Sequence, residues 1–185
     1  KVRARKPDIL YVLVQTTDAI QLTKQIQAAK MGIPYLVGTA QAQLPEWQNA
    51  VADGQDCWTG VTTWLPGLKF PADKKEPKLL PSAADWEKAW VDKYKAPPEF
   101  LEVGYYASTI LALLAVEETN SVDREKLREA LQKQEHQTPL GASKFHPSRV
   151  GINQAFDTMV VFQRQKKGDA FESVLLYPPE VATGK

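Results

Sequence analysis

The stretch "PDILYVLVQTTDAIQLTKQIQAAKMGIPYLVG", residues 7–38, decides the fold class. Residues 8–14 form a continuous apolar, β-branched run without alternation, which predicts a strand covered on both faces, as in a parallel sheet. A helical pattern over residues 19–31 separates it from a second predicted buried strand at residues 34–39. The order strand, helix, strand with short connections favours a right-handed parallel α/β unit.

The pattern continues outward in the C-terminal direction. Thr17 or Asp18 is expected to cap the first helix, because a short side-chain oxygen satisfies free amides of the first turn. Residues 44–54 predict a second helix that begins at Pro45, and residues 57–66 predict a third strand. The first third of the chain therefore reads as β-α-β-α-β.

The composition changes at "GLKFPADKKEPKLLPS", residues 67–82, which carries three prolines and four lysines and predicts a surface traverse. Three helices are expected next, at residues 82–94, 104–120 and 123–134. The second of these is apolar nearly all round and is predicted to be buried between layers. Two strands joined by a turn are expected at the end, beginning near residue 157.

This change predicts two domains. Residues 1–63 together with residues 158–185 form one domain, which holds the β-α-β-α-β unit and the final strands. Residues 64–157 contribute helices, a turn and a short strand to the other.

Composition and motifs limit the function. The formal net charge is +1 and no basic stripe stands out, so the chain is not expected to bind nucleic acid. No apolar run approaches the ~18 residues of a membrane span. The single cysteine, Cys57, is expected to be buried or partly buried, and no cofactor is predicted.

The two histidines lie in "HQTPLGASKFHPSRVGINQ", residues 136–154. His136 is expected to be solvated near a helix end, and His146 to serve a turn. Neither has the neighbours of a catalytic nucleophile or the spacing of a zinc site, so no catalytic residue and no metal site is predicted, and the chain is not expected to be an enzyme.

Ligand-binding potential lies elsewhere. In open parallel α/β sheets, ligands lie beyond the carboxyl ends of the strands. The residues expected there are neutral hydrogen-bonding side chains and one large aromatic, which can hold a small polar molecule. Some of them can instead cap a helix or pack in a hinge. With Tyr105 from the second of the three helices, the predicted ligand-binding set is Gln15, Thr16, Thr17, Thr39, Ala40, Trp64 and Tyr105.

The ordered set of segments resembles type I periplasmic binding proteins of the branched-chain amino acid class. The resemblance is carried by residues 4–38, by "KYKAPPEFLEVGYYASTILALLAVEET" and by "TPLGASKFHPSRVGINQ" with the strands that follow. It implies an α/β fold of two doubly wound parallel-sheet lobes, joined by hinge crossings and closed by the ligand. It also implies that this chain supplies roughly the second half of that fold.

The resemblance further implies an extracytoplasmic binding component of an ABC importer, with membrane permease subunits as partners. The expected location is the periplasm or the outer cell surface with a membrane anchor, and no signal segment is found in the chain. The protein is expected to be a monomer when complete. A chain that begins without Met inside such a pattern is expected to be a fragment, a cleavage product or an excised domain.

Two positions depart from the family pattern. Gln15 falls where amino-acid binders often present an aromatic side chain, and Ala40 falls where they often present an acid to the ligand's ammonium. A desolvated ammonium needs a charged partner. We therefore expect a small carboxylate, aromatic or aliphatic, or an amino-acid-like solute whose amine is met elsewhere. Three alternatives are a ligand-sensing receptor or regulator domain of the same fold, an α/β hydrolase-like or transferase fragment, and a purely structural fragment. A hydrolytic activity that is lost in His146→Gln would support the enzyme.

Overall fold

The computed structural model describes residues 2–149 and 151–184, and the chain divides into two compact units. Unit 1 is formed by Lys1–Thr62 with Met159–Lys185, and unit 2 by Thr63–Thr158. The predicted domain boundaries fall one residue from these divisions. That the two units belong to two lobes of a binding protein stays a prediction.

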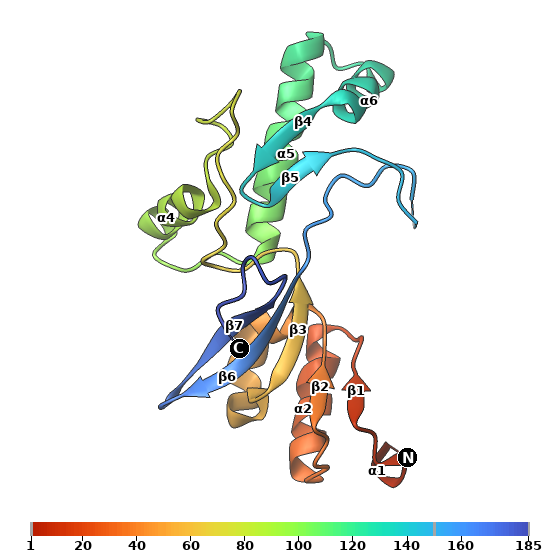
Figure 1. Cartoon of the computed structure of the whole chain (residues 1–185), viewed down its shortest axis with the longest axis vertical. Coiled ribbons are helices and arrows are strands. Elements are labelled where there is room, and N and C mark those ends of the chain that lie inside the picture. The colour runs from red at the N-terminus through yellow and green to blue at the C-terminus, as the bar shows by residue number, and fades with distance from the viewer. Residues whose placement is uncertain (1, 150, 185) are drawn as a thin grey trace. The chain divides into compact units, whose positions relative to one another are not determined.

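Unit 1 is built on a five-stranded sheet in the order β1-β2-β3-β6-β7 (Figure 1). The first three strands are parallel, and the last two run antiparallel to their neighbours. The β-α-β-α-β order is the one predicted. The strands are β1 (Ile9–Tyr11), β2 (Tyr35–Val37), β3 (Trp58–Thr62), β6 (Val160–Lys167) and β7 (Ala170–Tyr177); the helices are α1 (Val2–Arg5), α2 (Thr16–Ala28) and α3 (Pro45–Val51), with 3-10 turns η1 (Ala40–Gln43) and η2 (Ala52–Gln55).

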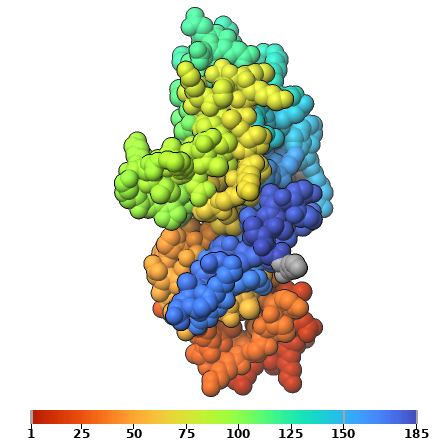
Figure 2. Space-filling model, turned by 60° about the vertical axis from the view of Figure 1, so that its left-hand side comes forward, coloured from red at the N-terminus to blue at the C-terminus, as the bar shows by residue number. Residues whose placement is uncertain are grey.

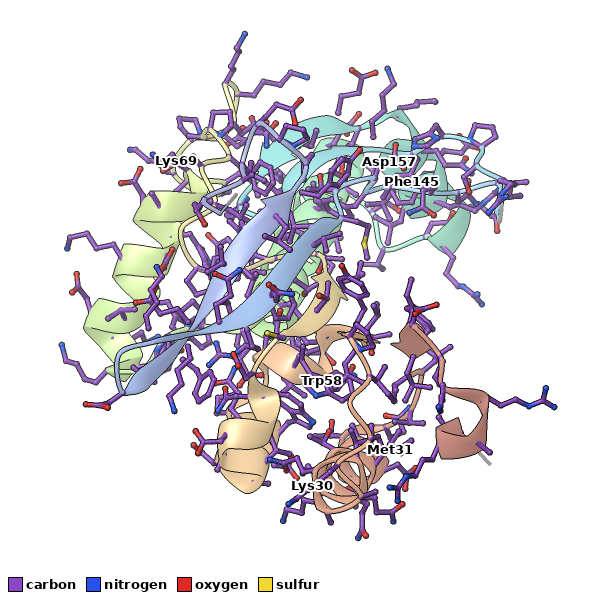
Figure 3. The ribbon with its side chains drawn as sticks, turned by 60° about the horizontal axis from the view of Figure 1, so that its bottom comes forward. Lys30, Met31, Trp58, Lys69, Phe145 and Asp157 are labelled. Atoms are coloured by element: carbon purple, nitrogen blue, oxygen red, sulfur yellow. The ribbon has the colours of Figure 1, made fainter. Side chains whose placement is uncertain are left out.

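Large aromatic side chains fill the core of unit 1. Trp47 of α3 and Trp58 of β3 are fully buried and meet edge to face, with ring centroids 5.5 Å apart. Figure 3 marks Trp58 among the strands and helices of this unit. Phe162 of β6 lies over Gly60, where an added Cβ would come within 2.5 Å of its ring. A side chain at position 60 would therefore displace Phe162.

The start of α2 differs from the expectation. The helix begins at Thr16, and its N-cap is Gln15, which makes no side-chain capping bond. Thr17 and Asp18 lie inside the first turn, so the prediction that either caps the helix is wrong. The spacing of apolar residues identifies the buried face of the helix but not its first residue. The residues of the first turn are polar and therefore do not contribute to that spacing.

The described residues of unit 2 form three helices and a hairpin (Figure 1). The predicted cap of the first helix is confirmed, because the hydroxyl of Ser82 accepts a bond from the amide of Asp85 at 3.1 Å. In the space-filling view, the yellow traverse before this helix spreads over the surface of the unit (Figure 2). The elements are α4 (Ala83–Tyr94), α5 (Phe100–Thr119), α6 (Arg124–Lys133), β4 (Glu135–Thr138) and β5 (Gly141–Lys144).

Helix α5 is covered on one side only. Its buried residues recur at helical spacing, and Leu111 and Leu114 pack with Leu80. Leu101, Tyr105 and Leu113 on its other side are exposed, so the prediction that the helix is buried between layers is wrong for the described residues. By length and composition α5 could cross a membrane, which the search for apolar runs missed. Its buried stripe is nevertheless that of a helix packed in a protein core.

The strand prediction for residues 8–14 needs a similar correction. Val12 is buried, but Ile9, Tyr11 and Leu13 are exposed, so only one face of β1 is covered by described residues. The unbroken apolar run correctly indicated a parallel strand. It could not indicate which residues cover the strand, because the sequence of a strand shows only that its side chains are suited to burial.

Candidate functional site

The carboxyl ends of β1 and β2 lie at one edge of the unit 1 sheet, because the two strands are parallel neighbours. Gln15 is exposed at this edge, immediately before α2. Thr16, half-buried, and Thr17, exposed, follow in the first turn of the helix. A helix start of this kind presents backbone N–H groups without intrahelical partners, which can accept a negatively charged group.

Thr39 and Ala40 follow β2 at the same edge, and both are half-buried. The backbone N–H and the hydroxyl of Thr39 both donate to the side-chain oxygen of Gln41, at 2.8 and 2.5 Å. Gly38 makes room for this amide, because an added Cβ would lie 2.0 Å from Gln41 Nε2. The loop after β2 is therefore held in shape by a side chain that the sequence reasoning missed.

Gln41 is only 4% exposed, and its Nε2 has no hydrogen-bond partner among the described residues. No sequence pattern marks this residue, because it lies outside a strand and its partners are the backbone N–H and the hydroxyl of a residue two positions away. Thr39, through its carbonyl oxygen, also lies close to Gly60, where an added Cβ would approach it to 2.9 Å. A larger residue at position 60 would therefore disturb the candidate site as well as the core.

The remaining two members of the predicted set belong to unit 2. Trp64 is fully buried and packs edge to face on Trp86, with ring centroids 5.8 Å apart. Tyr105 is 70% exposed on the uncovered side of α5. The structure thus brings five predicted residues to one edge of unit 1 and places the other two in unit 2. All seven ligand contacts stay predictions.

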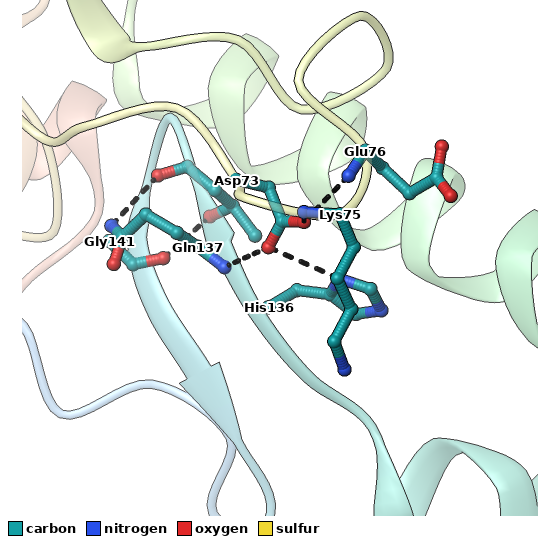
Figure 4. A network of polar contacts seen from close by, with 7 residues as sticks. Asp73, Lys75, Glu76, His136, Gln137 and Gly141 are labelled. Carbon is teal, nitrogen blue, oxygen red and sulfur yellow. Dashed lines mark hydrogen bonds and ion pairs between the residues drawn. The ribbon is translucent and has the colours of Figure 1, made fainter.

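His136 is not solvated at a helix end, as the sequence analysis expected. It lies in β4, is largely buried, and its Nδ1 is 3.3 Å from Asp73 Oδ2 (Figure 4). Asp73 also accepts backbone N–H bonds from Lys75 and Glu76, both at 2.8 Å, and from Gln137 at 2.7 Å. The residues "EHQT" were missed as a strand because their polar side chains show no apolar alternation.

The pKa of Asp73 reflects these contacts. Burial by itself raises the pKa of this carboxyl, but the backbone N–H groups of Glu76, Gln137 and Lys75, together with the charge of His136, outweigh that effect and lower it. Donors that bond the carboxylate form favour the ionised state. Asp73 therefore fastens the traverse of unit 2 to β4, and nothing in this arrangement requires catalysis.

His146 serves a turn, as its position suggested. Its backbone pairs with Gln154, and its ring contacts the carbonyl oxygen of Pro147 at 3.0 Å and Asp157 Oδ2 at 2.7 Å. Figure 3 labels Asp157 in this part of unit 2. The Pro147 carbonyl first, and the Asp157 carboxylate second, raise the pKa of His146.

This raised pKa predicts a pH dependence. Stability from charged His146 is present below the ordinary pKa of histidine and is lost as pH rises through the raised folded value. Thermal melts of wild type and His146→Gln should therefore differ at pH 5.5 and converge above the folded pKa. The difference should be small, because Asp157 is exposed. Asp157→Asn should remove part of it; a gap that widens at high pH would contradict the assignment.

Cys57 is exposed, contrary to the expectation of burial, and has a left-handed φ of 61° immediately before β3. Partial desolvation and the neighbouring Asp56 raise the pKa of its thiol, which lowers the fraction of reactive thiolate. Among residues 2–149 and 151–184, no group of three or more His, Cys, Asp or Glu side chains is placed to hold a metal ion.

The family model described as "Periplasmic binding protein" matches residues 1–169. The chain belongs to the periplasmic binding protein family. A search of curated protein sequences gave no significant match. The family membership explains why a parallel α/β unit, a helical segment and antiparallel strands follow one another in this chain.

Solved structures of periplasmic binding proteins share the fold. A leucine binding protein from Thermotoga maritima matches with a TM-score of 0.72 and 18% identity over 97% of this chain and 49% of its own. A type 1 periplasmic binding protein from Bordetella pertussis gives 0.71 and 18% over 91% and 46%. A branched-chain amino acid binding protein from Streptococcus pneumoniae, in complex with isoleucine, gives 0.64 and 15% over 92% and 45%.

These matches show the type I periplasmic binding protein fold and bear out the resemblance seen in the sequence. The chain spans about half the length of each solved structure.

Proposed function

We propose that this chain is part of an extracytoplasmic solute-binding protein that serves an ABC importer and binds its ligand without chemical conversion. The observation that carries the proposal is membership of the periplasmic binding protein family. The neutral hydrogen-bonding groups at the carboxyl ends of β1 and β2, called the strand-end edge, support it. The partners would be a small-molecule ligand and the importer's membrane permease subunits, and the complete protein would act as a monomer in the periplasm or anchored at the outer surface.

The ligand we favour is a small carboxylate without an α-ammonium group. The Streptococcus pneumoniae relative was solved with isoleucine, which carries both groups. At the strand-end edge here, Ala40 offers no carboxylate, and the residues of η1 are alanines and glutamines. A desolvated ammonium without a charged partner costs several kcal/mol, whereas the start of α2 favours a carboxylate.

Titration calorimetry on the complete binding protein tests this preference with a matched pair of ligands. Leucine and 4-methylpentanoate have the same carbon skeleton and differ only in the ammonium group. We expect 4-methylpentanoate or benzoate to bind at least about tenfold more tightly than leucine, a difference of about 1.4 kcal/mol. Tight binding of leucine or valine, without binding of either carboxylate, would contradict the proposal.

A substitution supplies the converse test. Ala40→Asp places a carboxylate at the strand-end edge and should shift the ratio of affinities toward leucine by about tenfold or more. Ala52→Asp is the matched control, because Ala52 is exposed in the same unit at η2. An equal shift in both variants would indicate a general charge effect and would remove Ala40 from the site.

A second candidate is a ligand-sensing receptor or regulator domain of the same fold, which the present fold equally permits. Copurification distinguishes the two: an importer's partner is a polytopic permease, whereas a sensor's partner is a signalling or regulatory protein. Ligand titrations do not separate these roles, because both bind a solute between lobes.

A further inference from the structure

A hollow of about 300 Å³ lies between helix α6 and the chain that follows β5. Its apolar lining comes from Leu127 and Leu131 of α6 and from Phe145, which Figure 3 labels. All three residues are half-buried. We call this feature the α6 hollow, and all of its lining residues belong to unit 2.

The spacing of residues on α6 explains the apolar side of the hollow. Leu127 and Leu131 are four positions apart, so they lie one above the other on the same side of the helix. Leu131 also packs against the buried cluster of unit 2 that contains Leu111. The floor of the hollow is therefore continuous with a packed core.

A second row of side chains on α6 supplies the polar rim. Arg124, Arg128 and Gln132 follow one another at intervals of four residues and line the same hollow. Gln132 Nε2 donates to Asn153 Oδ1 at 3.1 Å. This bond ties the helix to the loop that follows β5, so the two walls of the hollow are connected.

The two arginines of the rim differ in their partners. Arg128 is engaged, because its Nε and Nη2 donate to Glu125 Oε2 at 3.0 and 2.6 Å. Arg124 makes no hydrogen bond or ion pair with a described residue. No carboxylate is among the described residues that line the hollow. An occupant therefore meets an apolar floor and one guanidinium without a partner.

This combination selects the chemistry of an occupant. A guanidinium presents N–H donors in a planar fork that matches a carboxylate. A cationic head group would be repelled by Arg124. A phosphate monoester carries up to about two negative charges, which a single free arginine does not balance. The apolar floor favours a hydrocarbon body, because burial of apolar surface is favourable in proportion to its area.

The volume limits the size of that body. One water molecule takes about 30 Å³ of the liquid, so a hollow of about 300 Å³ has room for about ten non-hydrogen atoms. We propose that the α6 hollow is a second binding site, which takes an apolar monocarboxylate of about the size of octanoate. The site shares no residue with the strand-end edge of unit 1, and it does not rest on the proposed function.

Methyl NMR of the complete binding protein tests this site with matched probes. Octanoate and octylammonium carry similar hydrocarbon chains and opposite charges. Octanoate should shift the methyl signals of Leu127 and Leu131 in a saturable titration, and octylammonium should bind at least about tenfold more weakly. Hexanoate should also bind about tenfold more weakly than octanoate, because it buries fewer CH₂ groups.

A pair of substitutions tests the role of the free arginine. Arg124→Gln should weaken octanoate binding at least about tenfold, because it removes the charge and the planar fork but keeps a long side chain. Arg124 is exposed, so the variant is expected to fold as the wild type does. Lys126→Gln is the matched control, because Lys126 is exposed on the same helix and does not line the hollow.

Several outcomes overturn the proposal. Equal affinities for octanoate and octylammonium would show that the hollow does not select an anion. Equal losses in Arg124→Gln and Lys126→Gln would indicate a general effect of charge. Signals of Leu127 and Leu131 that respond to protein concentration and not to octanoate would assign the hollow to a contact between copies of the chain.

The position of the shifted signals separates this site from the strand-end edge. Shifts confined to methyl groups near Gln15, such as those of Val14, would place octanoate at the strand-end edge and leave the α6 hollow without a ligand. A wrong ligand at the strand-end edge does not alter the signals of Leu127 and Leu131. Failure of the proposed function and failure of this second site are therefore distinguishable.

Discussion

Replacing Asp73 with alanine is expected to lower the free energy of unfolding by about 3–5 kcal/mol. Asp73 is 5% exposed and accepts three backbone N–H bonds in addition to its contact with His136. Its removal leaves those donors, and the buried imidazole, without their acceptor (Figure 4). Urea denaturation at pH 7, followed by circular dichroism, measures the loss.

Two further variants provide reference values for the loss of stability in Asp73→Ala. Asp73→Asn retains one carbonyl oxygen and turns an N–H group toward remaining donors, so it should lose less than alanine, about 1–3 kcal/mol. Asp92→Ala removes an exposed ion pair with Lys88 and should cost far less than Asp73→Ala. Similar losses for Asp73→Ala and Asp92→Ala would show that the network does not fasten the traverse to β4.

The same carboxylate has a pH signature. Because its folded pKa is lowered, its contribution is present above the ordinary pKa of aspartate and is lost as pH falls through the folded value. Wild type should therefore lose stability on acidification more steeply than Asp73→Ala. Parallel acid transitions for the two proteins would contradict the assignment of the lowered pKa to Asp73.

Replacing Trp58 with alanine is expected to cost about 3–5 kcal/mol, because it leaves a large cavity against Trp47 and removes an edge-to-face aromatic contact. Trp58→Phe should cost clearly less. The indole N–H of Trp58 has no hydrogen-bond partner among the described residues. The substitution by phenylalanine therefore reduces the packed volume but removes no polar contact. Thermal and urea unfolding of both variants measure the difference.

An exposed aromatic side chain is the control for Trp58. Tyr177→Ala should change the free energy of unfolding by no more than about 0.5 kcal/mol, because Tyr177 is 58% exposed on β7. If Trp58→Phe proved as costly as Trp58→Ala, the indole nitrogen would have to make a stabilising bond, and the packing explanation would fail.

The parallel unit was predictable because its signals are local. Unbroken apolar runs, a helical period between them and Pro45 at the first position of α3 are each read within a dozen residues. The same applies to Ser82 as a cap and to the final pair of strands. The sheet edge that carries Gln15 and Thr39 followed from parallel order alone, since carboxyl ends of parallel strands share an edge.

Long-range partners escaped prediction. His136 was expected in solvent, yet it meets Asp73, 63 residues earlier, in a buried contact. The role of Gln41 was not predicted, because its partners are a backbone N–H and a hydroxyl. The exposure of Cys57 was not predicted either, because composition does not indicate backbone geometry. The apolar sides of β1 and α5 were expected to be covered, because apolar residues favour burial. An apolar segment does not indicate which other residues would cover it.

The sequence by itself determined the order of elements, the family and the absence of a recognisable catalytic pattern, because these depend on periodicity and residue type along the chain. Only the tertiary structure decided that Asp73 fastens the traverse of unit 2, that Trp64 packs on Trp86, and that α6 and Phe145 line an apolar hollow. These features depend on contacts between residues that are distant in the sequence. Hydrogen bonding and burial arise from those contacts, so they cannot be predicted from any single segment.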